Sequence, residues 1–448
     1  MPGLHAAAPR TIRMSSDMAR RLNANAPDFE VAFTALISGK RETEEDVAAA
    51  VATILADVRA SGDDALIALS QKFDRVTLTA QTLRLDPSEI AAAEKACSPE
   101  MLEALDLAAN RIAAYHGRQI PQDCFFTDEA GIQLGWRWTS LDSVGLYVPG
   151  GTASYPSSVL MNAIPARVAG VRRIAMVTPA SGGQINPLVL AAAKRAGVNE
   201  IYRIGGAQAV AALAYGTRTV APVDKIVGPG NAYVAAAKRA VFGLVGIDSI
   251  AGPSEILIIA DGMNDPEWIA ADLLSQAEHD ASSQSILVTD DADFADRVVA
   301  SVGSQLEKLP RKAIAAESWR AHGAVIVVPD LNAACELANR IAPEHLEIAT
   351  SDPAGLLDRI RHAGAIFLGR STPEAMGDYI AGPNHVLPTA RTARFSSGLS
   401  VLDFMKRTTL LSCGTEALDA IGPKAVTLAD AEGLGAHARS IAVRLSRK

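Results

Sequence analysis

The sequence has few of the features that mark secreted or membrane proteins. It holds only four cysteines among 448 residues, and these form no CxxC pair, so we expect free thiols in a reducing cytoplasm rather than a disulfide framework. Its longest apolar runs, such as residues 255–260 (EILIIA), are far shorter than the ~20 residues that a membrane span needs. The first ten residues also lack the apolar core of a signal peptide. We therefore expect a cytoplasmic protein that does not enter a membrane.

Excess positive charge is also missing. Lys and Arg number 42 against 50 Asp and Glu, and the formal charge of −8 argues against binding to nucleic acid. The motifs HExxH, GxxxxGK[ST] and GxSxG are absent, which argues against zincins, P-loop enzymes and serine hydrolases. What is present is a hydrophobic content of 49%, ordinary for a globular chain of two or three domains.

The order of secondary-structure patterns changes along the chain. The first ~130 residues are predicted to be mainly helical, because Val47, Val51, Ile54 and Val58 share one helix face. The alternation of apolar residues in 134–138, followed by residues 143–148, predicts a hairpin or two neighbouring strands. Strands and helices then alternate. The predicted strands are 173–178, 200–204, 225–227, 255–260, 284–289, 324–328, 346–349 and 364–368, and the predicted helices include 188–196, 207–215, 231–244 and 436–445.

This alternation predicts an α/β protein with two incomplete Rossmann-like, parallel-sheet domains and small helical extensions at both ends. We expect an N-terminal helical extension (1–44), a larger α/β domain (45–146 and 255–398), a second α/β domain (147–254) and a C-terminal tail (399–448).

Two glycine-rich loops follow neighbouring predicted strands. Residues 228–231 (GPGN) stand between a strand and a helix, where exposed N–H groups suit a pyrophosphate, but Tyr233 occupies the third glycine position of the dinucleotide fingerprint. Residues 205–208 (GGAQ) occupy the same kind of junction one unit earlier. The alternatives are a nucleotide site and plain βα turns. The GxGxxA match at 433–438 is rejected, because too little chain follows it to complete a βαβ unit.

Four of the eight histidines lie in polar segments with candidate chemistry. Gln276 continues the apolar stripe of a helix that begins after Asp265, and His279 follows three residues later. Residues 343–345 (PEH) join a general acid/base pair at the start of a strand. The other candidates are Asp378, residues 382–385 (GPNH), Glu432 and His437. Singly, each suits a structural or solvated side chain, but together they offer the N and O donors of a borderline metal site.

Taken in order, seven segments resemble the histidinol dehydrogenase family. They are residues 147–152 (YVPGGT), 205–208 (GGAQ), 228–231 (GPGN), 251–255 (AGPSE), 275–279 (SQAEH), 343–345 (PEH) and 382–385 (GPNH). The resemblance implies a homodimer in the histidine biosynthetic pathway, with one zinc ion per subunit. It further implies oxidation of L-histidinol through histidinal to L-histidine by NAD+, and active sites shared between subunits because the tail reaches the partner.

The resemblance also implies that the larger domain (45–146 and 255–398) carries most of the zinc and catalytic residues, that the second domain (147–254) binds NAD, and that individual residues have particular roles. The implied zinc ligands are Gln276, His279, Asp378 and His437, and the implied catalytic pair is Glu344 and His345. The implied NAD contacts are Tyr147, Gln208 and Asn231. The implied substrate contacts are Ser254, His385 and Glu432, together with His345 and the four zinc ligands. The alternative is a zinc-dependent hydrolase built on the same N/O cluster, which would need no NAD.

Overall fold

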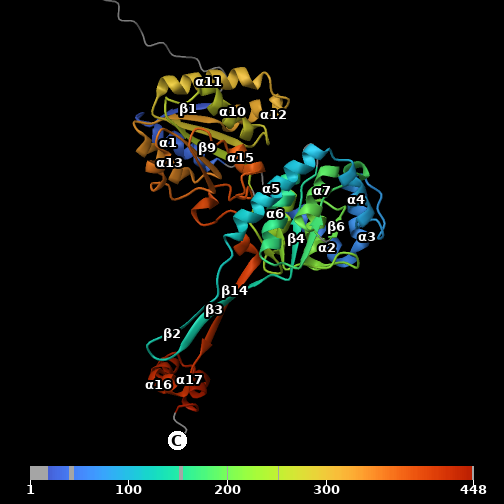
Figure 1. Cartoon of the computed structure of the whole chain (residues 1–448), viewed down its shortest axis with the longest axis vertical. Helices are drawn as coiled ribbons and strands as arrows, with labels where there is room; N and C mark the ends of the chain where they lie inside the picture. Colours follow the sequence, from blue (N-terminus) through green and yellow to red (C-terminus); the bar gives the residue numbers. More distant parts are fainter. Residues whose placement is uncertain (1–18, 40–44, 151–154, 199, 251, 446–448) are drawn as a thin grey trace, which may run out of the picture.

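The computed structural model describes residues 19–39, 45–150, 155–198, 200–250 and 252–445. These residues form two α/β units and a long arm that extends away from both (Figure 1). No helix within these ranges is long and apolar enough to cross a membrane.

The five-stranded unit contains a parallel sheet in the order β6-β5-β4-β7-β8. Its strands are β4 (Ser143–Tyr147), β5 (Arg173–Val177), β6 (Glu200–Tyr202), β7 (Lys225–Val227) and β8 (Gly246–Ile247). Its helices are α2 (Glu45–Ser61), α3 (Asp63–Phe73), α4 (Pro87–Lys95), α5 (Pro99–Gly117), α6 (Pro156–Val168), α7 (Pro187–Ala196), α8 (Gly206–Tyr215) and α9 (Ala232–Val241). One core joins the sheet to α2, α3, α8 and α9, and the other joins it to α5, α6 and α7, so both faces are covered as a parallel sheet requires.

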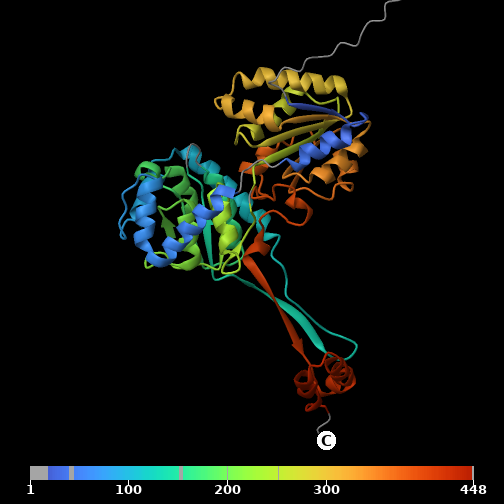
Figure 2. The same cartoon turned by 180° about the vertical axis from the view of Figure 1, so that it is seen from behind.

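The six-stranded unit contains a second parallel sheet, in the order β1-β11-β10-β9-β12-β13. Its strands are β1 (Arg20–Asn23), β9 (Glu255–Ala260), β10 (Gln284–Thr289), β11 (Ala324–Val327), β12 (His345–Ala349) and β13 (Ala365–Leu368). Its helices are α1 (Phe29–Ser38), α10 (Pro266–Ala277), α11 (Ala292–Leu306), α12 (Lys312–His322), α13 (Leu331–Ile341), α14 (Pro353–Leu357) and α15 (Glu374–Tyr379). Helices α10 to α12 cover one face, while α1 and α13 lie on the other, which Figure 2 shows from behind.

The arm is an antiparallel sheet in the order β14-β3-β2 with two helices at its far end. It comprises β2 (Cys124–Thr127), β3 (Gln133–Ser140), β14 (Met405–Ser412), α16 (Thr415–Ala431) and α17 (Gly435–Ala442). Only Ala417, Gly422 and Ala438 are buried within its helices, so the arm has almost no core of its own. Apolar side chains remain on its surface: Phe125, Leu411 and Leu428 are each 67–69% exposed.

The fold class predicted from the sequence is confirmed, but the chain is divided differently from the expectation. Residues 45–146 were expected to belong with 255–398. In the structure α2, α3 and α5 pack on the five-stranded sheet and β4 lies at its centre. Within 1–44, the described part is not only helical, because β1 adds an edge strand to the six-stranded sheet. The tail beyond residue 398 first packs on its own chain, through Val401 and Phe404, before it enters the arm.

The expected hairpin between residues 134–138 and 143–148 is wrong. β3 pairs with β2 and β14 in the arm, whereas β4 pairs with β5 and β7 in the five-stranded sheet. The two strands differ in burial: β4 is buried along nearly its whole length, as a central parallel strand must be, while β3 is mostly partly exposed.

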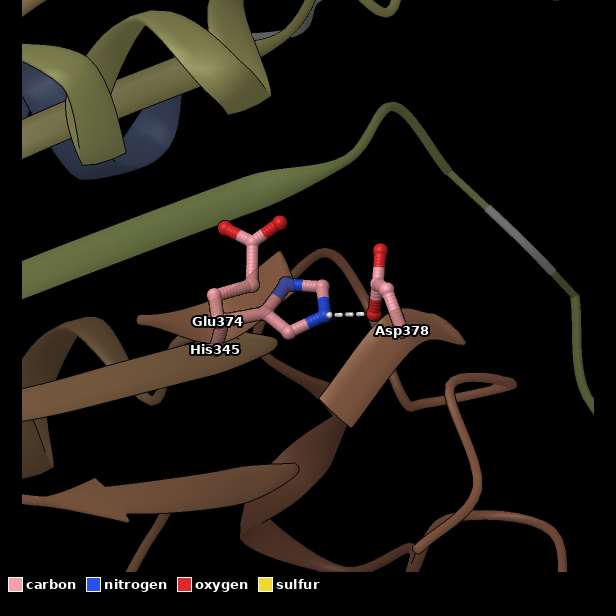
Figure 3. Close-up of side chains that lie close together, drawn as sticks. All are labelled: His345, Glu374 and Asp378. Carbon is pink, nitrogen blue, oxygen red and sulfur yellow. Dashed lines mark ion pairs between the residues drawn. The ribbon is translucent and has the colours of Figure 1, made fainter. Parts of the chain in front are cut away.

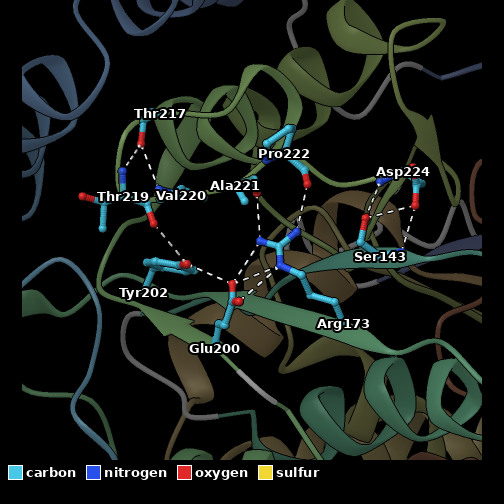
Figure 4. Close-up of polar contacts among 10 residues, drawn as sticks. All are labelled: Ser143, Arg173, Glu200, Tyr202, Thr217, Thr219, Val220, Ala221, Pro222 and Asp224. Atoms are coloured by element: carbon cyan, nitrogen blue, oxygen red, sulfur yellow. Dashed lines mark hydrogen bonds and ion pairs between the residues drawn. The ribbon is translucent and has the colours of Figure 1, made fainter.

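Polar contacts fix the amino edge of the five-stranded sheet (Figure 4). The Arg173 guanidinium donates to Glu200 Oε2 at 3.0 Å and to the carbonyl oxygens of Ala221 and Pro222 at 2.9 and 2.8 Å. The Tyr202 hydroxyl donates to the same Glu200 oxygen at 2.9 Å. This network holds the loop before β7 against the amino ends of β5 and β6.

Candidate active site

A cavity of about 450 Å³ is lined by residues of both α/β units. The five-stranded unit contributes residues that follow its strands, such as Gly228 and Asn231. The six-stranded unit contributes residues that precede its strands, such as Ser254, Asp280 and Glu344. The carboxyl edge of one sheet therefore faces the amino edge of the other.

The strand order of the five-stranded sheet explains why its carboxyl edge faces the cavity. In the five-stranded sheet the order reverses between β4 and β7, and ligands of open α/β sheets bind at the carboxyl side of such a point. The equivalent point in the six-stranded sheet lies between β9 and β12, where polar side chains contact one another. There the Asp261 carboxylate accepts from the Ser351 N–H at 2.7 Å and from Arg370 Nη2 at 2.8 Å.

The backbone at the start of β12 places the side chains of Glu344 and His345 against the same residue, Glu255. Helix α13 ends at Ala342, which has a φ of +50°, a left-handed conformation that is strained for a residue with a Cβ. Beyond Pro343, Glu344 Oε2 accepts from the backbone N–H of Glu255 at 2.8 Å. His345 Nδ1 donates to the carbonyl oxygen of the same Glu255 at 2.9 Å. Adjacent side chains, which normally diverge on a strand, thus meet with 3.6 Å between Glu344 Oε2 and His345 Nδ1.

Both groups have unusual proton affinities. Burial raises the pKa of Glu344 to about 7, although His345 opposes that rise. Burial alone would lower the pKa of His345, but the carboxylates of Glu344, Glu374 and Asp378 outweigh it, and the pKa lies well above its usual range. Such a carboxyl–imidazole pair in a cavity is suited to proton transfer near neutral pH.

Glu374 belongs to this cluster, although the sequence analysis did not single it out. One donor atom from each of His345, Glu374 and Asp378 lies within 4.8 Å of the others, and His345 Nε2 is 3.5 Å from Asp378 Oδ1 (Figure 3). Glu374 is 2% exposed, and burial raises its pKa to about 8. Its position four residues before Asp378 on α15 was the available signal, because such residues share a helix face.

Two further histidines surround Asp378. His385 Nδ1 donates to the backbone carbonyl of Asp378 at 2.9 Å, and its Nε2 lies 3.3 Å from the Ser158 hydroxyl of α6. His279 follows the end of α10 and lines the same cavity. Burial lowers the pKa of both imidazoles, which favours the neutral form that binds metals. Burial would raise the pKa of Asp378, but the neighbouring histidines lower it overall.

Gln276 is fully buried at the end of the α10 stripe, as the sequence pattern predicts. Its Nε2 lies 3.4 Å from His345 Nδ1, while its Oε1 has no hydrogen-bond partner. A buried amide oxygen without a partner is costly unless a ligand satisfies it. Together with the His279 imidazole and the Asp378 carboxylate, this oxygen makes a donor set that fits zinc.

The structure brings most, but not all, of the sequence-derived site residues together. Seven line the cavity: Asn231, Ser254, His279, Glu344, His345, Asp378 and His385. Tyr147 and Gln208 are 4% and 2% exposed, and the Tyr147 hydroxyl accepts from the Gly206 N–H at 3.0 Å. Glu432 and His437 are exposed on the arm, away from this chain's cavity.

Comparison with known proteins shows the family to which the chain is similar. The sequence profile described as histidinol dehydrogenase matches residues 38–445. The chain is 65% identical to histidinol dehydrogenase of Rhodospirillum rubrum over 96% of its own length and 99% of that protein, and 64% identical to that of Rhizobium meliloti over the same shares. It is also similar to the crystal structure of histidinol dehydrogenase from Elizabethkingia anophelis, with a TM-score of 0.91 at 38% identity, covering 95% of this chain and 98% of that one.

Proposed function

The chain belongs to the histidinol dehydrogenase family, and from this membership we propose that it oxidises L-histidinol through histidinal to L-histidine with two NAD+. The observation that carries the proposal is the convergence of Glu344 and His345 on Glu255, inside a cavity that also holds His279 and Asp378. This two-step oxidation needs groups that transfer protons and a set of nitrogen and oxygen donors that binds zinc, and the cavity offers both.

The cavity charge suits the proposed substrate. Four acidic side chains line it, whereas Lys238 is the single Lys or Arg among its described lining residues. Histidinol carries an amine that is protonated near neutral pH, so an acidic cavity attracts it. The serine and histidine side chains at the wall, Ser254 and His385 among them, offer hydrogen bonds to its amine and imidazole.

We assign one zinc ion to Gln276, His279 and Asp378 of this chain and His437 of a second copy. The unpartnered Gln276 oxygen and the His279 imidazole, whose pKa is lowered by burial, make the donor set suitable. Zinc has no redox chemistry, so when bound it would orient and polarise the alcohol and the aldehyde.

In the first oxidation His345 accepts the alcohol proton while a hydride leaves for NAD+. Its Nδ1 hydrogen is held by Glu255, which leaves Nε2 to take that proton. The surrounding carboxylates raise the pKa of His345 and favour its protonated form, so the positive charge of the bound substrate is needed to lower that pKa. The ring then passes its Nε2 proton to solvent before it accepts the alcohol proton. In the second oxidation Glu344 removes a proton from water as the oxygen bonds to the aldehyde carbon, and the protonated His345 gives its proton to the carbonyl oxygen to form the hydrate. His345 then accepts a hydroxyl proton of the hydrate as the second hydride passes to NAD+.

NAD+ is assigned to the carboxyl edge of the five-stranded sheet, at the strand-order reversal between β4 and β7. Asn231 lines the cavity there, and its Oδ1 caps α9 by accepting from the N–H groups of Tyr233 and Val234 at 3.1 and 3.2 Å. Its amide nitrogen remains to donate to the cofactor. Tyr147 and Gln208 are packed beneath this edge and would reach NAD+ only if the neighbouring loops shift.

We further propose a cytoplasmic homodimer whose arms complete each other's sites. The arm lacks a core, exposes apolar side chains and carries both Glu432 and His437. Such a surface is typical of a protein interface. The four cysteines are free thiols, which suits the reducing cytoplasm.

A turnover assay tests the central proposal. The purified protein is mixed with L-histidinol and NAD+, and NADH absorbance is followed together with histidine by mass spectrometry. We expect two NADH per histidine formed and loss of both products with a chelator. The hydrolase alternative is favoured instead if histidinol and NAD+ yield no NADH while the zinc-loaded protein is folded.

A further inference from the structure

A buried ion pair lies at the cofactor side of the cavity. Lys238 of α9 and Asp248, which directly follows β8, form this pair with side chains that are 2% and 4% exposed. Both residues line the cavity. The mechanism described above uses neither of them.

The pair anchors one residue of the GPGN turn from two sides. Asp248 Oδ2 accepts from the N–H of Gly228 at 2.7 Å, and Lys238 Nζ donates to the carbonyl oxygen of Gly228 at 3.0 Å. Gly228 has a φ of +112°, and a Cβ there would come within 2.1 Å of the Tyr147 carbonyl oxygen. The turn is thus pressed against the end of β4 in a conformation open only to glycine.

The far end of the turn is held separately, by the Asn231 cap on α9. Pro229 has no N–H to donate, and the Asn231 oxygen caps α9. A buried ion pair adds little net stability compared with apolar residues of similar size, so stability alone does not account for charges at this position. The side-chain hydrogen bonds described for Lys238 and Asp248, beyond the ion pair itself, both go to Gly228 of the turn at the cavity rim.

We propose that Lys238 and Asp248 are positioning residues that hold the 228–231 turn in its cofactor-binding shape. This inference rests on the assignment of NAD+ to this edge of the sheet. The pair acts through the backbone of Gly228 and takes no part in proton or hydride transfer. Its loss therefore weakens the cofactor complex and leaves the histidinol subsite, which belongs to the six-stranded unit, unchanged.

The test compares Lys238→Met, Asp248→Asn and the double variant with Lys225→Met. Lys225 is a matched control, because it is an ion-paired lysine of β7 that contacts Asp403 at 3.2 Å and does not line the cavity. NADH affinity is measured by fluorescence titration, KM is measured for both substrates, and thermal unfolding reports stability. Asn231→Asp, which retains an acceptor for the α9 cap but loses the amide donor, tests the location of the cofactor.

Because misplaced binding groups are costly, we expect Lys238→Met to weaken NADH binding and raise KM for NAD+ by about tenfold or more, with KM for histidinol unchanged. The double variant leaves no unpaired buried charge and retains an amide acceptor for Gly228, so NADH affinity should recover to within about threefold of wild type. This recovery distinguishes positioning from general damage. Lys225→Met should lower the unfolding temperature without changing NADH affinity.

Two results would overturn the inference, and they distinguish a wrong positioning role from a wrong cofactor site. If Asn231→Asp weakens NADH binding while the folded Lys238→Met and Asp248→Asn proteins keep wild-type affinity, the pair is purely structural. If none of these variants changes NADH affinity, the cofactor lies elsewhere, and the positioning role is wrong together with the proposed cofactor site.

Discussion

His345 Nδ1 lies 2.9 Å from the backbone carbonyl oxygen of Glu255, so the imidazole hydrogen at this nitrogen is held by a neighbouring strand. Because β9 and β12 are adjacent parallel strands in register, this contact is built into the sheet rather than into a loop. It fixes the ring orientation and leaves Nε2 directed toward Asp378, at 3.5 Å. The proton-transfer atom is thereby set by the core of the six-stranded unit.

Replacing Glu344 with glutamine should harm aldehyde oxidation more than alcohol oxidation. The amide oxygen can still accept from the Glu255 N–H, so the fold is expected to persist, but an amide cannot remove a proton from water. General-base catalysis is worth about 10²–10⁴ in rate, and we expect a loss of that size in single-turnover oxidation of histidinal. Glu347→Gln is the matched control, since this buried β12 glutamate does not line the cavity; it should leave the ratio of the two half-reactions unchanged. Equal losses in both halves for Glu344→Gln would contradict its role.

The pH dependence of the second oxidation should follow Glu344. Burial raises the pKa of this carboxyl to about 7, so it is protonated, and inactive as a base, in more acidic solution. The single-turnover rate of histidinal oxidation should therefore rise about tenfold per pH unit below this pKa and level off above it. Glu344→Gln should flatten this limb of the profile. A wild-type rate that falls as the pH rises through 7 would exclude the carboxylate as the base.

The sequence predicts the strands better than it predicts their assembly. Residues 255–260 form a buried strand as expected, because a short apolar run with β-branched residues suits a parallel sheet. The helices before residue 118 were also expected, but their periodicity shows only that one face is buried, not which sheet buries it. Residues 45–146 were therefore grouped with the wrong sheet. Helix α16 was missed because Gly422 and Pro423 stand in its middle, and both residues disfavour helix interiors.

The sequence likewise predicts single residues of the candidate active site better than it predicts their contacts. Gln276 could be recognised as a polar residue on a buried helix face, and Glu344 and His345 as an acid/base pair at a strand start. Glu374 offered only its spacing of four residues from Asp378, and Lys238 and Asp248 offered no signal, because charged residues are usually solvated. Their burial depends on contacts between segments far apart in the sequence, which no local pattern encodes.

Removing the metal should abolish activity while the fold survives. Each α/β unit has its own apolar cores on both sheet faces, and none of the proposed ligands Gln276, His279 and Asp378 belongs to them. Circular dichroism after chelation should match that of the zinc-loaded protein, and added zinc should restore NADH production. Loss of helical signal together with the metal would show instead that the metal site supports the fold.

Mixing two inactive variants should restore activity if His437 serves the partner's site. In this chain His279 lines the cavity, whereas His437 is exposed on the arm. His279→Ala and His437→Ala are unfolded, mixed and refolded together. By random pairing about half of the dimers are mixed, and each has one intact and one doubly damaged site, so activity should return to roughly a quarter of wild type.

A second pair of variants supplies the control for this mixing experiment. His279→Ala and Glu344→Gln damage the same cavity of one chain, so every mixed dimer carries two damaged sites and activity should stay near zero. Glu344→Gln mixed with His437→Ala should instead recover activity, as the first pair does. Mass spectrometry of the refolded protein verifies that mixed dimers form. If they form and His279→Ala with His437→Ala remains inactive, the two histidines act within one subunit, and the arm has to fold back on its own chain to complete the site.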